Sequence, residues 1–323
     1  MAAPAITVAR PRRSFLLRLR TGDEVAHLIT FLFAACVVLV TILLVWELWR
    51  ASAPSRHQFG FSFLKNSNWD PVAGDFGALS FIYGTVLTSL IALVISVPLG
   101  VGAAIFLAEL APPRMASSCT FLVELLAAVP SVIYGLLAIF TVIPLLREYG
   151  EPFLKSTLGF LPLFKGPMLG FGYLAAGIIL AVMTFPYIIS ISRESLLEVP
   201  RDQREAAMAL GATRWEATSQ VVVPYARLGI LGSVFLALAR ALGETMAVTM
   251  VIGNNTDISM SWFASGYTLA AGIANQFTEA TGKIYLSSLV ELGLVLFLIT
   301  IIVNALARLL VIATSRKGTA HSA

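Results

Sequence analysis

The sequence predicts an all-α, polytopic membrane protein with six transmembrane helices. Hydrophobic residues make up 58% of the 323 residues and charged residues only 12%, and the mean hydropathy is +0.85. A water-soluble domain of this length cannot bury so much apolar surface. Six stretches are long enough to cross about 30 Å of hydrocarbon as helices. These stretches are 28–49, 82–107, 125–146, 172–191, 228–252 and 284–310.

Lys and Arg are distributed unevenly between the loops on the two sides of the predicted spans. Fourteen of the 22 fall on the side that holds both termini, seven fall on the opposite side, and Arg240 lies inside the fifth span. Cytoplasmic loops carry the excess of positive charge in membrane proteins. We therefore expect both termini to be cytoplasmic.

The chain is expected to form one membrane domain at residues 27–313, between a cytoplasmic N-terminal arm at 1–26 and a cytoplasmic tail at 314–323. Arg12 and Arg13 resemble a twin-arginine export signal. The apolar run that follows is longer than that of a signal peptide, and five more spans come after it. The first span is therefore expected to remain as an anchor. The loop at 146–172 is rich in Pro and Gly, which predicts turns.

Motifs for several functional classes are absent from the sequence. Cys36 and Cys119 cannot form a disulfide framework, and no Walker A, HExxH or GxSxG pattern occurs. We expect no enzymatic activity, cofactor or metal site on this chain, with an intramembrane enzyme as a distant alternative. Nucleic-acid binding is not expected either, because a short loop tethered between two spans could hardly follow a DNA groove.

The loop at 193–227, between the fourth and fifth spans, contains the clearest local signals. Two capping-box spacings predict two short helices, a glycine between them suits the left-handed residue that ends a helix, and a proline is expected to close the loop. The residues involved are Asp202, Glu205, Gly211, Thr213, Glu216 and Pro224. Periodicity alone would fit a simple connecting hairpin equally well.

The same loop resembles the EAA loop of bacterial ABC importer permeases. Glu205-Ala206-Ala207 is followed, after three intervening residues, by Gly211 and, after nine more intervening residues, by Val221, Val223 and Pro224. In that family the loop forms coupling helices that fit a groove in a cytoplasmic ATPase. The resemblance implies the type I importer (MetI-like) fold. It also implies an ATPase contact through Glu205, Ala206, Ala207 and Gly211, which Arg204 and Trp215 would complete.

Two charged residues, Arg240 and Glu244, lie inside the predicted fifth span. Burying both without compensation would cost about 5 to 7 kcal/mol. Their spacing of four residues on one helix allows either an ion pair that satisfies itself or a polar substrate path. On the second interpretation, Arg240 attracts an anion, and Glu244 accepts a hydrogen bond from the O–H group that phosphate retains and sulfate lacks.

Two further carboxylates lie in or near predicted spans. Glu124 is placed at the cytoplasmic end of the third span and Glu291 inside the sixth. Each is a candidate pathway or interface residue, with a purely structural role as the alternative.

Other segments resemble the PstC-type permease of the bacterial phosphate importer. They are Phe76-Gly77-Ala78-Leu79, Ile82-Tyr83-Gly84-Thr85, Val97-Pro98-Leu99-Gly100, Phe106-Leu107-Ala108-Glu109, Pro130-Ser131-Val132-Ile133-Tyr134-Gly135 and the stretch from Arg240 to Val248. The resemblance implies a multi-pass protein of the bacterial inner membrane that carries inorganic phosphate past Arg240 and Glu244.

The resemblance also implies a set of partners. They are a PstA-type sister permease, two PstB-type ATPase subunits that use ATP and Mg, and a periplasmic or lipid-anchored phosphate-binding protein, all in contact with membrane lipids. The alternatives are the sister phosphate permease itself, a permease for another oxyanion (phosphonate, sulfate or molybdate), and a passive anion channel. The coupling loop argues against the channel, which needs no joint for an ATPase.

Overall fold

The computed structural model describes the backbone of residues 23–319 and the side chains of residues 25–309. The described chain contains six helices that are long and apolar enough to cross a membrane, as the composition predicts. It divides into two compact units, Met1–Arg50 and Ala51–Ala323. The predicted N-terminal arm at 1–26 and tail at 314–323 lie largely outside the described residues, although 314–319 continue the last helix.

The first unit contains α2 (Asp23–Ala51), the first candidate span. Its most apolar window has a mean hydropathy of 3.1, and its apolar side chains point in all directions around the helix. A helix that is apolar on every side is typical of a membrane span. This confirms a span at the position that the sequence predicts.

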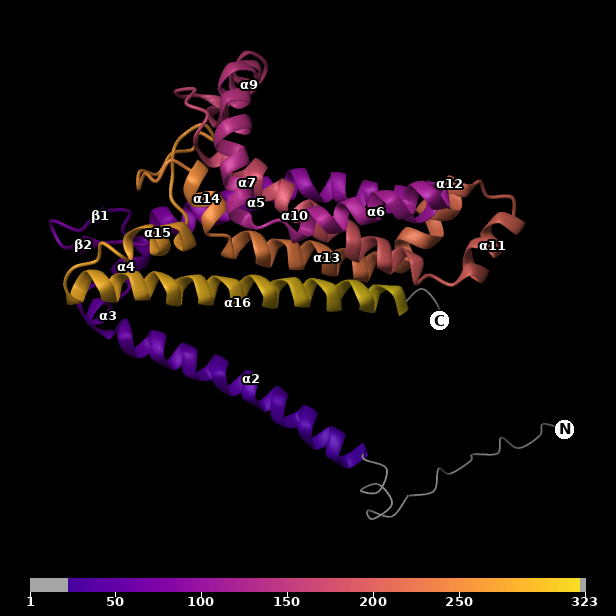
Figure 1. The fold of residues 1–323 in the computed structure, drawn as a ribbon, viewed down its shortest axis with the longest axis horizontal. Coiled ribbons are helices and arrows are strands. Elements are labelled where there is room, and N and C mark those ends of the chain that lie inside the picture. The colour runs from indigo at the N-terminus through magenta and orange to yellow at the C-terminus, as the bar shows by residue number, and fades with distance from the viewer. Residues whose placement is uncertain (1–22, 320–323) are drawn as a thin grey trace. The chain divides into compact units, whose positions relative to one another are not determined.

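The second unit is a bundle in which four long helices run side by side (Figure 1). They are α5 (Leu79–Ile105), α10 (Tyr173–Leu197), α13 (Val223–Gly243) and α16 (Lys283–Thr319). The most buried is α10, and α5 packs closely along it because two glycines remove side chains at the contact. A Cβ on Gly177 would lie 2.4 Å from Ile91 Cγ2, and one on Gly100 would lie 2.7 Å from Ile188 Cγ2.

Helices α10 and α13 also contact each other through small residues. Ser192 and Ser233 form a hydrogen bond of 2.8 Å between their hydroxyl oxygens, and both side chains are fully buried. Ala237 and Ala241 continue the buried row toward the end of α13. Ser233, Ala237 and Ala241, spaced four residues apart on α13, therefore serve helix packing.

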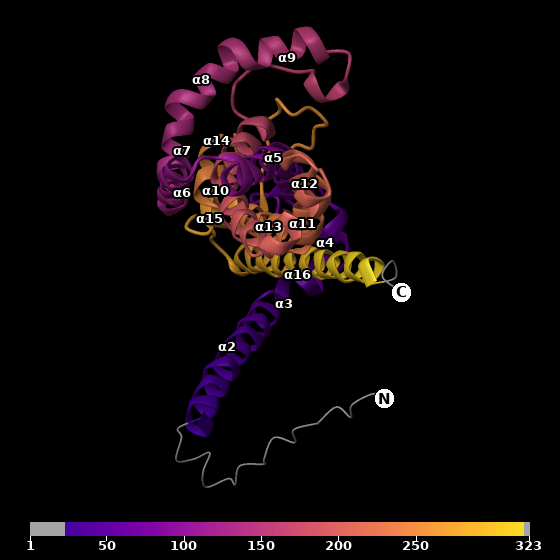
Figure 2. The same ribbon diagram turned by 90° about the vertical axis from the view of Figure 1, so that its right-hand side faces the viewer.

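The third span differs from the prediction of 125–146. Helix α6 (Pro113–Ala128) ends before Val129 and Pro130, which are extended, and the span begins only at Ser131. Pro130 disfavours helical backbone at the residue before it, so the helix stops there. From Ser131 an arched helix continues to Leu158 (Figure 2). Its segments are α7 (Ser131–Leu137), η2 (Ala138–Val142), α8 (Ile143–Leu145), η3 (Leu146–Gly150) and α9 (Glu151–Leu158).

The first half of the 146–172 loop is therefore helical, and the prediction of turns throughout it is wrong. Pro144 and Pro152 do not break the helix because each follows a π-turn by two residues. A π-turn changes the hydrogen-bond pattern at the point where proline has no N–H to donate. Pro224 follows the π-turn η5 (Thr218–Val222) in the same way. It continues the helix into α13 and does not close the loop.

The fifth span also differs from the prediction of 228–252. The candidate span is Arg214–Gly243, and Glu244 then takes an extended conformation with ψ of 129°. A short helix, α14 (Met246–Val251), follows. Gly243 at the end of α13 is the weakest helix former in this stretch, which favours an interruption here.

The end of the bundle opposite the α10–α13 loop carries short elements. They are α3 (Ala53–Phe59), α4 (Ser62–Lys65), β1 (Trp69–Asp70), β2 (Asp75–Phe76), the 3-10 turn η4 (Pro162–Phe164) and α15 (Leu269–Gln276). Trp69 and Phe76 of the antiparallel β1–β2 hairpin pack on Phe81 of α5 and Tyr285 of α16. This aromatic cluster joins the hairpin to the helical core.

Candidate functional site

The α10–α13 loop forms a hairpin of two short helices, as predicted. They are α11 (Arg201–Ala209) and α12 (Arg214–Ala217), which continues through η5 into α13. Gly211 has φ of +91°, its N–H donates to the Met208 carbonyl at 3.0 Å, and the next N–H, of Ala212, donates to Ala207 at 3.2 Å. These two bonds form a Schellman motif, which a left-handed glycine completes at low cost.

The second predicted capping box is confirmed and the first is wrong. Glu216 N–H donates to Thr213 Oγ1 at 3.3 Å, while Thr213 N–H donates to Glu216 Oε2 at 2.7 Å. At α11 the N-cap is Pro200, so Asp202 lies inside the first turn and makes no cap bond with Glu205. A carboxylate in the first turn still interacts favourably with the helix dipole.

The hairpin exposes both small and large apolar residues among its charged ones. Glu205 and Ala206 are exposed, Ala207 is half-buried, Trp215 is 59% exposed and Leu210 is 91% exposed. Sequence analysis did not identify Leu210, although its position before the left-handed Gly211 places it at the hairpin tip. An exposed aromatic and aliphatic pair beside small residues is typical of a protein contact surface.

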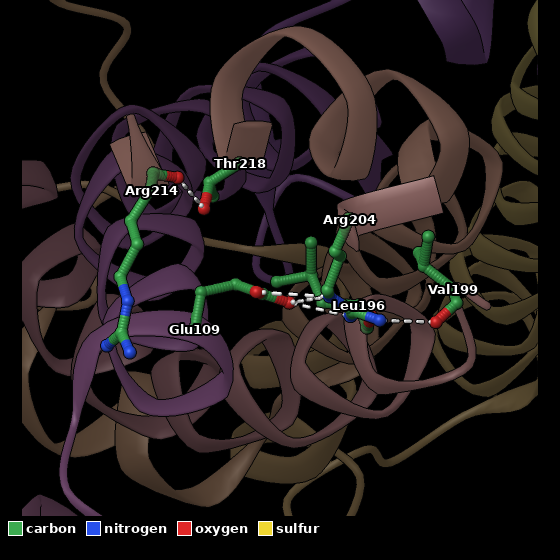
Figure 3. A network of polar contacts seen from close by, with 6 residues as sticks. All are labelled: Glu109, Leu196, Val199, Arg204, Arg214 and Thr218. Atoms are coloured by element: carbon green, nitrogen blue, oxygen red, sulfur yellow. Dashed lines mark hydrogen bonds and ion pairs between the residues drawn. The ribbon is translucent and has the colours of Figure 1, made fainter. Parts of the chain in front are cut away.

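Arg204 of α11 points into the protein, where it lies at the centre of a polar network (Figure 3). Its Nη2 lies 2.7 Å from Glu109 Oε1, and its Nε lies 3.2 Å from both oxygens of that carboxylate. Nη2 also donates to the Leu196 carbonyl at 2.7 Å, and Nη1 donates to Val199. Arg204 and Glu109 are only 18% and 10% exposed. Glu109 belongs to the segment Phe106-Leu107-Ala108-Glu109 of the family resemblance, and nothing in the sequence had indicated a role for it.

A cavity of about 600 Å³ lies between this network and the second arm of the hairpin. Arg201, Arg204 and Arg214 line it together with the carboxylates of Glu109 and Glu205. Arg214 belongs to α12, and its carbonyl accepts the Thr218 hydroxyl at 2.8 Å (Figure 3). Both charge signs meet in this cavity, which favours protein contacts over the selective capture of an anion.

Arg240 and Glu244 do not form the ion pair that the sequence left open. Among the residues that the structure describes, Arg240 has no carboxylate within 4 Å. The break after Gly243 removes the continuous helical face that would have paired them. Arg240 is exposed on α13, and its Cζ lies 4.4 Å from the ring centroid of Tyr187 on α10. A cation–π contact of this kind orients a guanidinium and leaves its N–H groups available.

Two tyrosines hold this region in place. Tyr134 belongs to the Pro130–Gly135 segment of the family resemblance but was given no role, and Tyr187 was not identified from the sequence. Tyr187 donates to the Ala127 carbonyl at 3.3 Å, and Tyr134 of α7 donates to the Leu126 carbonyl at 2.7 Å. Both acceptors lie in the last turn of α6, whose carbonyls have no partners within the helix. The aromatic support under Arg240 is therefore fixed by the break at Pro130.

Glu244 occupies the interruption between α13 and α14. Its Oε1 accepts the Ala247 N–H at 3.4 Å, and its side chain is half-buried. The backbone of the preceding Gly243 is exposed. The long distance of this cap leaves the carboxylate free to accept a stronger hydrogen bond.

The two other candidate carboxylates lie in different surroundings. Glu124 is exposed on α6 at the edge of a second cavity, which Arg193 and Thr120 also line. Glu291 is only 5% exposed, and its Oε2 is buried without a hydrogen-bond partner among the described residues. This location supports a packing role for Glu291. Within residues 23–319, no three His, Cys, Asp or Glu side chains come close enough to hold a metal ion.

Comparisons with known proteins agree on one family. Residues 96–316 match the family of binding-protein-dependent transport system inner membrane components. The chain is 46% identical to the phosphate transport system permease protein PstC of Mesorhizobium japonicum, over 95% of this chain and 94% of that protein. It is also 46% identical to PstC of Xylella fastidiosa, over 88% and 90% of the two chains. The probable PstC of Methanocaldococcus jannaschii is 37% identical, over 88% and 92%.

Solved structures support the same architecture at the level of fold. The chain resembles a chain of a bacterial ABC transporter involved in the import of the acidic polysaccharide alginate, with a TM-score of 0.59 and 14% identity over 90% of this chain and 98% of that one. Members of the matched family are permease components and not enzymes. The chain belongs to the PstC family of phosphate transport system permeases, multi-pass inner-membrane components of binding-protein-dependent transporters.

Proposed function

We propose that the chain is the permease subunit of an ATP-driven inorganic phosphate importer and forms half of its translocation path. The observation that carries the proposal is Arg240, a guanidinium in the membrane-spanning bundle that is exposed and has no carboxylate within 4 Å among the described residues. In a chain related to phosphate permeases, such a group is suited to a passing oxyanion.

Arg240 also explains why one such chain encloses only half of the path. An exposed guanidinium facing lipid would be costly, so a second subunit or water must cover that face of α13. A PstA-type sister permease is the partner that the family suggests. The resulting heterodimer places Arg240 on a polar path between two bundles.

Glu244 supplies the discrimination between phosphate and sulfate. At neutral pH phosphate still carries a proton, and the weakly engaged Glu244 carboxylate can accept it in a hydrogen bond. Sulfate has no such proton and would meet a repulsive carboxylate. Arg240 thus attracts an oxyanion of either kind, while Glu244 favours phosphate, which retains a proton, over sulfate.

In this proposal the hairpin α11–α12 receives the movement of the ATPase and transmits it to the membrane helices. Its exposed surface, with Glu205, Ala206, Leu210 and Trp215, together with the half-buried Ala207, fits a groove in one of two PstB-type ATPase subunits. The Schellman motif at Gly211 fixes the backbone conformation of the turn between the two helices that carry this surface. ATP and Mg act in the ATPase, and a periplasmic or lipid-anchored phosphate-binding protein delivers phosphate on the other side.

The orientation follows from the loop charges. Because the 193–227 loop and the two termini hold most of the Lys and Arg residues, we place them in the cytoplasm, with the β1–β2 hairpin and α15 on the periplasmic side of a bacterial inner membrane. A cysteine in place of Trp215 should then react with an impermeant thiol reagent only in inside-out vesicles.

The proposal is tested with vesicles that contain both permeases, the ATPase and the binding protein. Phosphate uptake should require ATP on the side of the vesicle membrane that carries the ATPase. It should also exceed the uptake of sulfate, molybdate and phosphonate. Uptake that continues without ATP would indicate a channel. A preference for another oxyanion would reassign the substrate.

A further inference from the structure

Arg204 uses nearly all of its hydrogen-bonding capacity within this chain. A guanidinium has five N–H groups, and four of them are occupied by the Glu109 carboxylate and the carbonyls of Leu196 and Val199. Little of the side chain is left for a partner protein. Its neighbours Arg201 and Glu205, in contrast, are exposed.

The partners of Arg204 come from three different segments. Glu109 lies in the π-turn η1 (Phe106–Leu110) at the end of α5, Leu196 lies in the last turn of α10, and Val199 lies in the link to α11. Carbonyls at the end of a helix lack partners within the helix, and a cation is favourable there. One side chain therefore fastens the first coupling helix to the ends of two membrane helices.

The geometry of the ion pair makes this connection stiff. Both carboxylate oxygens of Glu109 lie within 3.2 Å of Arg204 nitrogens, and both side chains are mostly buried. A forked arrangement fixes orientation as well as distance, which a lysine ammonium cannot do. Loss of one partner would leave the other charge mostly buried and without its opposite charge.

We propose that Arg204 and Glu109 form an internal latch that makes the coupling hairpin move as one body with the ends of α5 and α10. The latch rests on the proposed function, because it converts ATPase movement into movement of the two helices that support the substrate path. Arg204 and Glu109 are positioning residues and touch neither phosphate nor the ATPase. Without the latch, the hairpin would still move with α13, into which α12 continues, while the ends of α5 and α10 would no longer follow it.

The test uses the complete complex in vesicles, with phosphate import and ATP hydrolysis measured on the same preparation. The variants are Arg204→Gln, Glu109→Gln, Arg204→Lys, the single changes Arg204→Glu and Glu109→Arg, and the exchanged pair that combines these last two. Arg114→Gln is the matched control, because Arg114 is exposed in the first turn of α6, close in sequence to Glu109. Co-purification of the ATPase with each variant reports the docking contact separately.

The latch predicts a loss of coupling with docking intact. In Arg204→Gln and Glu109→Gln the ATPase should still co-purify, and phosphate imported per ATP hydrolysed should fall about tenfold, as expected for loss of coupling between two sites. Arg204→Lys should be intermediate. The exchanged pair should import more phosphate per ATP than either of its single changes, Arg204→Glu or Glu109→Arg, and Arg114→Gln should match the wild type.

Other outcomes would overturn the latch. If Arg204→Gln abolishes ATPase co-purification while Glu109→Gln has no effect, Arg204 is a docking residue. If both variants import as much phosphate per ATP hydrolysed as the wild type, the ion pair does not transmit movement from the hairpin to the membrane helices. If the single variants do not assemble, recovery of assembly by the exchanged pair supports the latch and lack of recovery overturns it. Failure of the wild-type complex to import phosphate would instead contradict the proposed function, so the two failures are distinguishable.

Discussion

Two arginines of this protein, Arg204 and Arg240, have opposite surroundings. Arg204 is 18% exposed and is bound by a carboxylate and two carbonyls of the same chain. Arg240 is exposed, and its described contact is the face of Tyr187 at 4.4 Å. The same side chain thus serves as an internal fastening in one place and as an available cation in the other. Satisfied hydrogen bonds distinguish a structural arginine from one that is kept free for a ligand.

The largest expected effect is that of Arg240→Gln on transport. Removing the charge that attracts the anion should lower phosphate uptake about 100-fold, equivalent to about 2.7 kcal/mol, in the range of charge-assisted hydrogen bonds. Uptake into vesicles with all subunits measures the effect. The heterodimer should purify in normal yield, because no residue that the structure describes forms an ion pair with Arg240. Loss of assembly would show instead that Arg240 is a structural group.

The next largest effect is on the stability of the heterodimer, which should fall on substitution of Arg204 but not of Arg240. Arg204→Gln should destabilise the heterodimer by about 2 kcal/mol, because it leaves the mostly buried Glu109 without its cation and two carbonyls without their donors. Thermal unfolding of the purified heterodimer measures this against Arg240→Gln, which should unfold close to the wild-type temperature. Equal shifts for the two variants would contradict the contrast between the arginines.

Glu244→Gln should change which anion passes. The preference for phosphate over sulfate should fall about tenfold, because the amide no longer repels sulfate and accepts the phosphate proton less strongly. Competition of sulfate against labelled phosphate uptake gives the ratio. Glu291→Gln is the matched control, since Glu291 lies between α3 and α16 and should leave the preference unchanged. An unaltered preference in Glu244→Gln would remove Glu244 from the selection step.

The smallest effect is expected at Tyr187, which supports Arg240. Tyr187→Leu removes a cation–π contact of about 0.5 to 1 kcal/mol and should raise the KM for phosphate about threefold. Tyr187→Phe keeps the ring, so its KM should stay near that of the wild type. If the two variants behave alike, the hydroxyl bond to Ala127 matters more than the ring face.

Local signals in the sequence were enough for much of the fold and of the hairpin. Length and hydropathy predict the number of spans, because a bilayer imposes the same requirement on every crossing helix, but the bounds of the third and fifth spans were wrong. Gly211, Thr213 and Glu216 predict the turn and the second cap because these residues act on their own backbone. Asp202 has the same spacing signal, but Pro200 takes the N-cap position before it.

The remaining features depend on packing between distant segments. Arg204 and Glu109 are 95 residues apart, and nothing local in either segment indicates their ion pair. The interruption at Glu244 divides an apolar stretch that is otherwise uniform, so hydropathy runs across it. Tyr187 and Arg240 meet because Gly- and Ser-mediated contacts bring α5, α10 and α13 close together. Such long-range contacts define the site, which is why its residues were only partly predicted.

The central claim, that this permease imports phosphate with energy from ATP, is tested most directly by anion uptake in vesicles holding the complete wild-type complex. Labelled phosphate and labelled sulfate are offered separately, with ATP and with a non-hydrolysable analogue. The account predicts accumulation of phosphate against its gradient with ATP alone, and little accumulation of sulfate. Equal accumulation of both anions, or phosphate entry that is indifferent to ATP hydrolysis, would contradict it.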